Sequence, residues 1–355
     1  MSATRPTASP SIITTSSADA SFAPRSDPPG NPPLHFLPRA PIISLTFRRV
    51  ENMPIALLKR MLRIGTAPGA ESRRFRNYHI VRIIHEGEKA FVYQARSAKD
   101  DRLYAIKAYK PSYHRTARRM FKRYRLRHEG EVGMTLNPPP GIPEADYPIV
   151  RTISFDREFG NPDGCLYIVL EYVDGFSVKR MVGCAHPLLR ARRLDIARSL
   201  ARALTIMHDR GFVHRDLCSD NVLVMKEGPV KLIDLGFAAP GGIAFEEKSG
   251  TPSYMSPEQC AGRPVNPASD LYSLGIVLFE LFTGRLPFTS SIPADNPKLA
   301  ARRVSELMQH HLHAKPPSPS EFAADLPPGL DGLILRCLEK NPERRPPTAR
   351  HVMNE

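Results

Sequence analysis

Residues His214 to Asn221 read HRDLCSDN and place a carboxylate, an arginine and an asparagine in one short stretch that follows a long helical pattern. The Asp216 carboxylate is able to accept a proton from an attacking hydroxyl group, which is the task of a general base. Asn221 offers an amide oxygen, the type of ligand that a hard cation such as Mg²⁺ prefers. The stretch therefore predicts a loop that handles a hydroxyl group and a metal ion.

A second carboxylate follows the apolar run VKLI, in the segment Asp234-Leu235-Gly236. An apolar run of this kind is typical of a buried strand, so the carboxylate is expected at a strand end. Together, Asp234 and Asn221 would give a magnesium ion two oxygen ligands.

Composition indicates a globular protein with an unusual beginning. The chain has 355 residues, and the 41% that are hydrophobic are enough to bury a sizeable core. Near the start, Pro, Ser and Thr are dense and few large apolar side chains offset the entropy of ordering the chain. We expect a disordered Pro/Ser/Thr-rich tail over residues 1–45 and a basic amphipathic linker over 46–77. The linker would be a helix that docks on the following domain or, alternatively, touches a membrane surface.

The net charge of +14 favours acidic partners, although basic proteins often use such a charge for solubility alone. No run of about 18 apolar residues is present, so no transmembrane segment is predicted. The beginning also lacks a secretory signal pattern. The odd number of widely spaced cysteines favours a reducing compartment over a disulfide framework or a zinc site. A cytoplasmic location is the resulting expectation; the cysteines are Cys165, Cys184, Cys218, Cys260 and Cys337.

The chain from residue 78 divides into two lobes. Over 78–173, short β-type runs such as HIVRII, AFVYQAR and RLYAIKAY predict an antiparallel sheet of about five strands. One basic helix is expected between them, from Tyr113 to Leu136. Over 174–353 the period changes to that of helices, with patterns at 268–284, 297–313 and 329–340. The fold class is therefore α+β, with a small antiparallel sheet lobe that holds one helix and a larger, mainly helical lobe.

Four segments in order resemble the motifs of one family. HRDLCSDN resembles a kinase catalytic loop, and DLG at 234–236 is similar to the metal-binding D-F-G. Tyr104 to Lys107 (YAIK) resembles the V-A-I-K strand, and Gly250 to Gln259 (GTPSYMSPEQ) resembles the end of an activation segment. The chain thus resembles the Hanks-type (eukaryotic-like) serine/threonine protein kinases, bacterial branch, with their two-lobe fold over 78–353.

This resemblance implies a nucleotide site for ATP. Lys107 would reach the α and β phosphates and would be held by Glu129, with Glu131 as the alternative partner. The other residues implied to contact the nucleotide or its metal are Gly87, Val92, Ala105, Glu171, Val173 and Asp234.

It also implies the catalytic and metal residues. Asp216 would orient and deprotonate the substrate hydroxyl group, with Lys107 and Asn221 as the other members of the catalytic group. Asn221 and Asp234 would hold Mg²⁺.

Four further residues have roles implied by the resemblance. Glu258 would pair with Arg345, and Asp270 would brace the catalytic loop. Arg215 would clamp a phosphorylated activation segment, for which the acceptors are Ser249 first, then Thr251 and Ser253.

Two positions depart from the family pattern. The loop that covers the phosphates retains Gly87, whereas His85 and Ala90 occupy the other two glycine positions. Cys218 stands where serine/threonine kinases place a lysine that steadies the γ-phosphate. Both changes could reduce the rate of phosphate transfer.

The resemblance implies a protein kinase that transfers the γ-phosphate of ATP to Ser or Thr hydroxyl groups of proteins, with autophosphorylation. A weakly active or inactive pseudokinase scaffold is the alternative, based on the two departures. Residues 115–127 carry a run of Lys and Arg that is either a solvated face or a docking surface for an acidic partner. A nucleic-acid partner is not expected.

Overall fold

The computed structural model describes residues 77–143, 146–155, 166–225, 228, 230–246, 249–293 and 296–355, without the side chains of 114–118. The predicted tail over 1–45 lies outside the described residues, as does the linker over 46–77 apart from its last residue.

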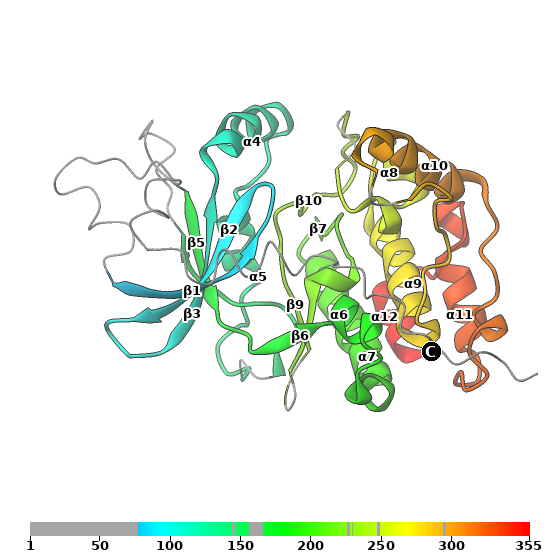
Figure 1. Cartoon of the computed structure of the whole chain (residues 1–355), viewed down its shortest axis with the longest axis horizontal. Coiled ribbons are helices and arrows are strands. Elements are labelled where there is room, and N and C mark those ends of the chain that lie inside the picture. The colour runs from blue at the N-terminus through cyan, green and yellow to red at the C-terminus, as the bar shows by residue number, and fades with distance from the viewer. Residues whose placement is uncertain are drawn as a thin grey trace, which may run out of the picture. The chain divides into compact units, whose positions relative to one another are not determined.

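The small lobe is built on one antiparallel sheet, at the left of Figure 1. The strand order is β1-β2-β3-β5-β4. Its core lies on the face where Tyr93, Ile106 and Val169 are fully buried, as the alternation of side chains across a strand requires. The strands are β1 (Tyr78–Glu86), β2 (Ala90–Ser97), β3 (Leu103–Tyr109), β4 (Thr152–Phe155) and β5 (Tyr167–Glu171).

Two helices, not one, accompany this sheet, which corrects the expectation of a single helix over 113–136. They are α4 (Pro111–Tyr124) and α5 (Glu129–Leu136). Helix α4 ends at Arg125, whose backbone is left-handed and whose N–H bonds to Phe121 O. His128 then caps α5 by accepting a hydrogen bond from Gly130 N. The chain is therefore redirected between the two helices although the sequence contains neither Gly nor Pro there.

The large lobe is mainly helical and contains the main core. Helix α9 is buried on every side from Ser269 to Phe282, so it forms the centre of this lobe. The predicted helices at 268–284, 297–313 and 329–340 are present with shifted ends, and 297–299 is a 3-10 turn. The helices are α6 (Val178–Gly183), α7 (Pro187–Asp209), α8 (Pro257–Cys260), α9 (Pro267–Thr283), α10 (Ala300–His313), α11 (Leu330–Cys337) and α12 (Ala349–Asn354).

Two small sheets position the segments that carry chemistry. One has the order β6-β8-β9, and the other pairs β7 with β10. HRDLCSDN connects β7 to β8, and DLG lies between β9 and β10, so both segments emerge from the same small sheets (Figure 1). These strands are β6 (Gly175–Ser177), β7 (Phe212–Val213), β8 (Val222–Met225), β9 (Val230–Leu232) and β10 (Ala239–Pro240).

Among the described residues, none of the helices combines the length and the apolar character needed to cross a bilayer.

Candidate active site

Lys107 lies at the centre of a buried charge cluster between the lobes. Its Nζ is 2.9 Å from both carboxylate oxygens of Glu129 on α5 and 2.8 Å from Asp234 Oδ1 in the large lobe. Tyr109, on the same strand as Lys107, donates its hydroxyl hydrogen to Glu129 Oε2. The cluster connects β3, α5 and the DLG segment.

The electrostatics of the cluster follow from burial and pairing. Burial alone would lower the pKa of Lys107, but the charges of Asp234 and Glu129 outweigh it and raise that pKa, so the ammonium group stays charged. Burial opposes ionisation of Asp234 as well, yet Lys107 and the Gly236 N–H lower its pKa to about 2. For Glu129, burial dominates and the pKa is raised. Asp234 is therefore an anion at neutral pH, as a metal ligand must be.

Asp216 and Asn221 lie together in the catalytic loop. Asn221 Nδ2 donates to the Asp216 backbone oxygen at 2.9 Å. This hydrogen bond uses the amide nitrogen and leaves the amide oxygen of Asn221 on the other side of the amide group. Ile233 N donates to the Asn221 backbone oxygen at 2.8 Å, which ties the loop to the segment that carries Asp234. Burial raises the pKa of Asp216, although a hydroxyl hydrogen bond from Thr251 opposes the change.

The loop is braced from below by α9. Asp270 is fully buried and accepts hydrogen bonds from the backbone N–H groups of His214 and Arg215 at 2.8 and 2.9 Å. His208 Nε2 lies 2.8 Å from the same carboxylate. These three contacts to the buried Asp270 carboxylate fix the backbone conformation directly before Asp216.

The activation segment contacts the catalytic loop through Thr251 and Gln259. From the sequence, Thr251 was considered as a phosphate acceptor and Gln259 was given no role. Thr251 donates to Asp216 Oδ1 from both its N–H and its Oγ1, each at 2.7 Å. Gln259 Nε2 donates to the Arg215 backbone oxygen at 2.8 Å. Gln259 was placed in the segment GTPSYMSPEQ without a role of its own, so this contact was missed.

Glu258 and Arg345 form a buried ion pair across the large lobe. Arg345 Nη1 and Nη2 lie 2.8 and 3.0 Å from the two carboxylate oxygens, so the pair is bidentate. It fixes the end of the activation segment against the last third of the chain.

The residues expected around the nucleotide occupy one face and one edge of the small lobe. Val92 faces Lys107 across the β2–β3 ladder, and Ala105 is two residues before Lys107, so these three side chains share a face. Glu171 ends β5, and its carboxylate accepts bonds from Arg151 N at 2.9 Å and Lys231 Nζ at 2.8 Å. Its carboxylate is thus engaged within the protein, and its backbone N–H donates to Arg151 O at 3.0 Å. Gly87 lies in the β1–β2 turn, and Val173 follows β5.

The donor set fits Mg²⁺ and a nucleotide triphosphate. A magnesium ion is usually held by one or two protein oxygens together with phosphates and water, and Asp234 and Asn221 are an anionic and a neutral oxygen ligand. The charged ammonium of Lys107 lies 2.8 Å from Asp234 Oδ1, so it suits a phosphate oxygen next to that carboxylate.

Residues 78–355 match the family described as "Protein kinase domain". The chain belongs to the protein kinase family. Serine/threonine-protein kinase PknB of Mycolicibacterium smegmatis is 33% identical to this chain, over 77% of this chain and 41% of that protein. A probable serine/threonine-protein kinase of Streptomyces coelicolor is 31% identical, over 76% of this chain and 37% of that protein. PknB of Mycobacterium tuberculosis is 32% identical, over 77% of this chain and 41% of that protein. This kinase chain thus spans less than half the length of these relatives.

The family match confirms the fold class: a kinase fold with a small antiparallel sheet lobe and a larger helical lobe. It also confirms the resemblance to bacterial serine/threonine kinases, since the relatives are bacterial proteins of that name.

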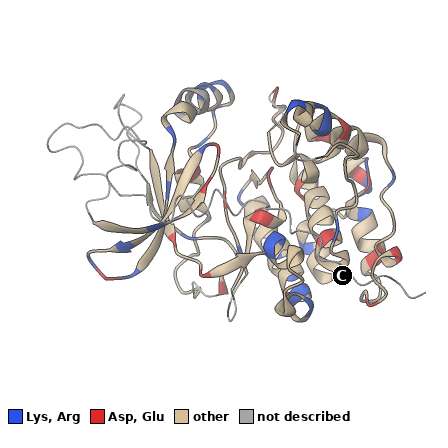
Figure 2. Ribbon diagram, viewed as in Figure 1, with Lys and Arg blue, Asp and Glu red and all other residues tan. Residues whose placement is uncertain are grey.

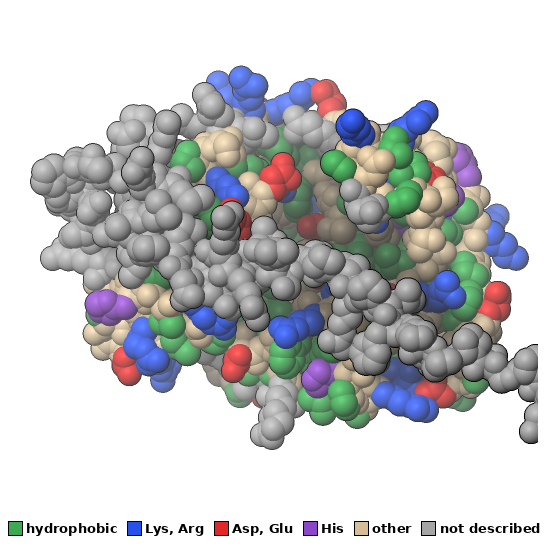
Figure 3. Space-filling view, viewed as in Figure 1, with side chains coloured by type: hydrophobic (Ala, Val, Ile, Leu, Met, Phe, Trp, Pro, Cys, Tyr) green, Lys and Arg blue, Asp and Glu red, His purple; other side chains and the backbone are tan. Residues whose placement is uncertain are grey.

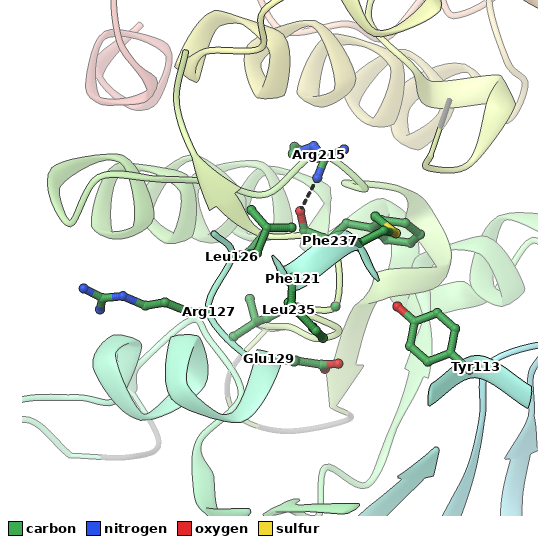
Figure 4. Close-up of a pocket in the computed structure, with 11 residues that line it drawn as sticks. Tyr113, Phe121, Leu126, Arg127, Glu129, Arg215, Leu235 and Phe237 are labelled. Carbon is green, nitrogen blue, oxygen red and sulfur yellow. Dashed lines mark hydrogen bonds between the residues drawn. The ribbon is translucent and has the colours of Figure 1, made fainter. Parts of the chain in front are cut away.

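A small pocket of the kinase lies between the two helices of the small lobe and the residues after DLG. Figure 4 shows Glu129 and Phe121 on one side and Leu235 and Phe237 nearby. Arg215 Nη1 donates to the Phe237 backbone oxygen at 3.1 Å, the dashed line in that figure. The segment after DLG is therefore held by the catalytic loop.

The basic helix α4 of the kinase contacts the activation segment. Arg123 forms an ion pair with Glu246, and the rings of Tyr124 and Phe245 are 4.8 Å apart. The ribbon of α4 carries further Lys and Arg positions, blue in Figure 2, and Figure 3 shows Lys and Arg side chains along the same upper edge. Part of the predicted docking run 115–127 therefore has an acidic partner inside the chain, and the side chains of Arg115 and Arg118 are outside the described ones.

Proposed function

We propose that the chain transfers the γ-phosphate of ATP to Ser or Thr hydroxyl groups of proteins. The observation that carries the proposal is the contact of Lys107 with both Glu129 and Asp234, because it joins the small-lobe lysine to the carboxylate of the large lobe. A lysine held in this way is ready to orient phosphates. These intact contacts favour an active kinase over the scaffold alternative.

In this proposal each residue has one task. Lys107 binds the α and β phosphates, Glu129 holds Lys107, and the backbone at Glu171 and Val173 meets the adenine. Asp234 and Asn221 hold Mg²⁺, which when bound neutralises charge on the phosphates.

Asp216 acts on the second substrate. Its carboxylate orients the Ser or Thr hydroxyl group and accepts its proton while the hydroxyl oxygen forms a bond to the γ-phosphorus. The bond from that phosphorus to the bridging oxygen breaks, and its electron pair leaves on ADP. The Thr251 hydroxyl and N–H, which now bond to Asp216, fix the carboxylate in position before the substrate arrives.

The choice of Ser and Thr rests on the names of the relatives, which are serine/threonine kinases. We also propose a cytoplasmic location, because the odd number and wide spacing of the cysteines in the sequence suit a reducing compartment. For the α4 run, we propose that its remaining basic residues contact an acidic protein, which a steep salt dependence of binding would support.

Autophosphorylation at Ser249 is part of the proposal. Arg215 Nη2 donates to Ser249 Oγ at 2.9 Å, so a phosphate on this serine would face a guanidinium group. We expect mass spectrometry after incubation with ATP and Mg²⁺ to find phosphate on Ser249, and Ser249→Ala to lose it. Ser253→Ala, in the same segment, serves as the control and should retain it. An unmodified peptide spanning 236–258 in an active enzyme would contradict this expectation.

The proposed activity is tested by transfer of labelled γ-phosphate to a generic basic protein, followed by identification of the phosphorylated amino acid. Wild type should produce phosphoserine or phosphothreonine, and Asp216→Asn should not. Equal transfer by both proteins would refute the role of Asp216, and no transfer by either would refute the activity.

A further inference from the structure

The catalytic loop lacks a cation where phosphate charge must be balanced. Cys218 lies two residues after Asp216 and is 2% exposed. A cysteine side chain carries no positive charge in either of its protonation states. A neutral thiol provides no charge to a phosphoryl group in transfer, and such charge is a major part of catalysis in this chemistry.

A lysine in the facing lobe lies near the same place. Lys89 is at the tip of the β1–β2 hairpin, and its backbone is fixed on both sides. Gly87 N donates to Ala90 O at 2.9 Å, which closes the turn, and Lys110 N donates to Lys89 O at 2.8 Å, which ties the tip to the end of β3. The side chain therefore starts from a defined point above the cleft.

The Lys89 side chain turns into the cleft. Its Nζ lies 3.3 Å from the centroid of the Phe237 ring and 5.6 Å from that of Tyr113. Its neighbours Glu86 and Glu88 are exposed, whereas Lys89 is half-buried. An ammonium group over an aromatic face is attracted by the ring, and Phe237 is held in turn by Arg215.

The electrostatic neighbours of Lys89 are the carboxylates of the active site. Burial lowers its pKa, while Asp234 and Asp216 act in the opposite direction. Because Phe237 directly follows the DLG segment, the position of Nζ over its ring puts Lys89 on the side of the site that carries Asp234, in agreement with these electrostatic interactions.

We propose that Lys89 contacts the transferred phosphate of ATP and supplies from the small lobe the positive charge that Cys218 does not supply from the catalytic loop. The proposal rests on the proposed kinase function. The proposal also connects the two departures from the family pattern, the loss of glycines around Gly87 and the presence of Cys218. A glycine-rich hairpin tip would cover a phosphate with backbone alone, whereas a long cationic side chain at this tip reaches the phosphate and adds charge.

Nucleotide binding tests the proposal without relying on activity. Titration calorimetry with ATP and with ADP, each with Mg²⁺, compares wild type with Lys89→Met and Lys89→Arg. We expect Lys89→Met to weaken ATP about tenfold and ADP less than about twofold, and Lys89→Arg to keep most of the ATP affinity. The control is Lys99→Met, an exposed lysine in the β2–β3 turn, which should change neither affinity.

A second arm tests the exchange of roles. Cys218→Lys in the Lys89→Met background should recover most of the lost preference for ATP over ADP, whereas in the wild-type background it should add little. If Cys218→Lys does not fold, protection of Lys89 from an amine-acylating reagent by ATP, but not by ADP, replaces this arm.

The outcomes separate the two proposals. Unchanged ATP affinity in Lys89→Met, in a protein whose phosphate transfer is abolished by Asp216→Asn, would overturn the role of Lys89 and leave the kinase function standing. A wild-type protein that binds no ATP would overturn both. A parallel loss of ATP and ADP affinity in Lys89→Met would show that Lys89 only shapes the cleft, and would overturn its role at the transferred phosphate.

Discussion

Two residues of the site have a left-handed backbone conformation that residues other than glycine rarely adopt. The angle φ is 68° at Arg215 and 61° at Asp234. Such residues cost about 1–3 kcal/mol each and persist only where the surroundings fix them. Arg215 is fixed by Asp270 and Gln259, and Asp234 by Lys107 and Gly236. The strained backbone therefore lies at two residues whose side chains belong to the site, Arg215 and Asp234.

The buried position of Cys218 predicts an unreactive thiol. Because burial raises its pKa to about 12, little thiolate is present at neutral pH. Among the described cysteines, Cys184 is exposed and should react before Cys218. Peptide mapping after brief treatment with iodoacetamide should find Cys184 alkylated and Cys218 intact. Faster labelling of Cys218 would show that the catalytic loop opens to solvent.

At the scale of elements, helix α5 packs against β4 so closely that it needs glycine. A Cβ added at Gly133 would overlap the Thr152 hydroxyl group, and one at Gly130 would overlap the Phe155 side chain. Since α5 carries Glu129, the close packing of α5 on β4 determines the position from which Glu129 contacts Lys107.

Gly133→Ala should therefore destabilise the protein, although Gly to Ala in a helix usually stabilises by about 1 kcal/mol. The overlap with Thr152 must move α5 and weaken the Lys107–Glu129 pair, so we expect a lower melting temperature and weaker ATP binding. Met134→Ala, at an exposed position of the same helix, is the matched control. A Gly133→Ala protein that is more stable than wild type would contradict the packing.

The Glu258–Arg345 pair predicts a pH dependence of stability. Burial would raise the pKa of Glu258, but Arg345 outweighs it, so the folded pKa is below the ordinary value of 4.5. A lowered carboxyl pKa adds stability that is fully present above the unfolded pKa and is lost as pH falls through the folded pKa.

Glu258→Gln should therefore lower the free energy of unfolding at pH 7 by about 3 kcal/mol, since Arg345 stays buried without its anion. The variant should also lose less stability than wild type when the pH falls from about 5 to about 3. Urea unfolding at both pH values measures this, with exposed Glu343→Gln as the control. Identical pH dependence in wild type and Glu258→Gln would disprove the contribution of the pair.

The elements show what sequence patterns can and cannot predict. Strands and core helices were predictable because the hydrophobic period of each is set locally. The break between α4 and α5 was not, because it depends on a left-handed Arg125 and on the His128 cap, and basic residues continue through it.

At the scale of the whole kinase unit, the site was predictable where each residue belongs to a short motif. Lys107, Asp216, Asn221 and Asp234 each lie in such a motif. The structure pairs Lys107 with Asp234 and Asn221 with Asp216, and Ile233, next to Asp234, bonds to Asn221. The contact of Lys89 with Phe237 was not predictable, because it joins residues from the two lobes and no local pattern records it.

The helix α4 adds a contact between the lobes that the sequence did not reveal. Tyr124 OH accepts a hydrogen bond from Glu246 N at 3.1 Å, next to the Arg123–Glu246 pair. Through this contact the small lobe reaches the activation segment directly, in addition to the Lys107–Asp234 pair inside the cleft. The position of α4 is thus coupled to the segment that carries Ser249.

If the kinase orients ATP through Lys107 and Asp234 while Asp216 acts on the hydroxyl group of a protein substrate, removal of the Asp216 carboxylate must stop transfer and leave ATP binding intact. The most direct test measures ATP affinity and phosphate transfer on the same samples of wild type and Asp216→Asn. We predict equal ATP affinity within about twofold and a loss of transfer of about a thousandfold or more in Asp216→Asn. Transfer at the wild-type rate by Asp216→Asn, or none by the wild type despite bound ATP, would contradict the account.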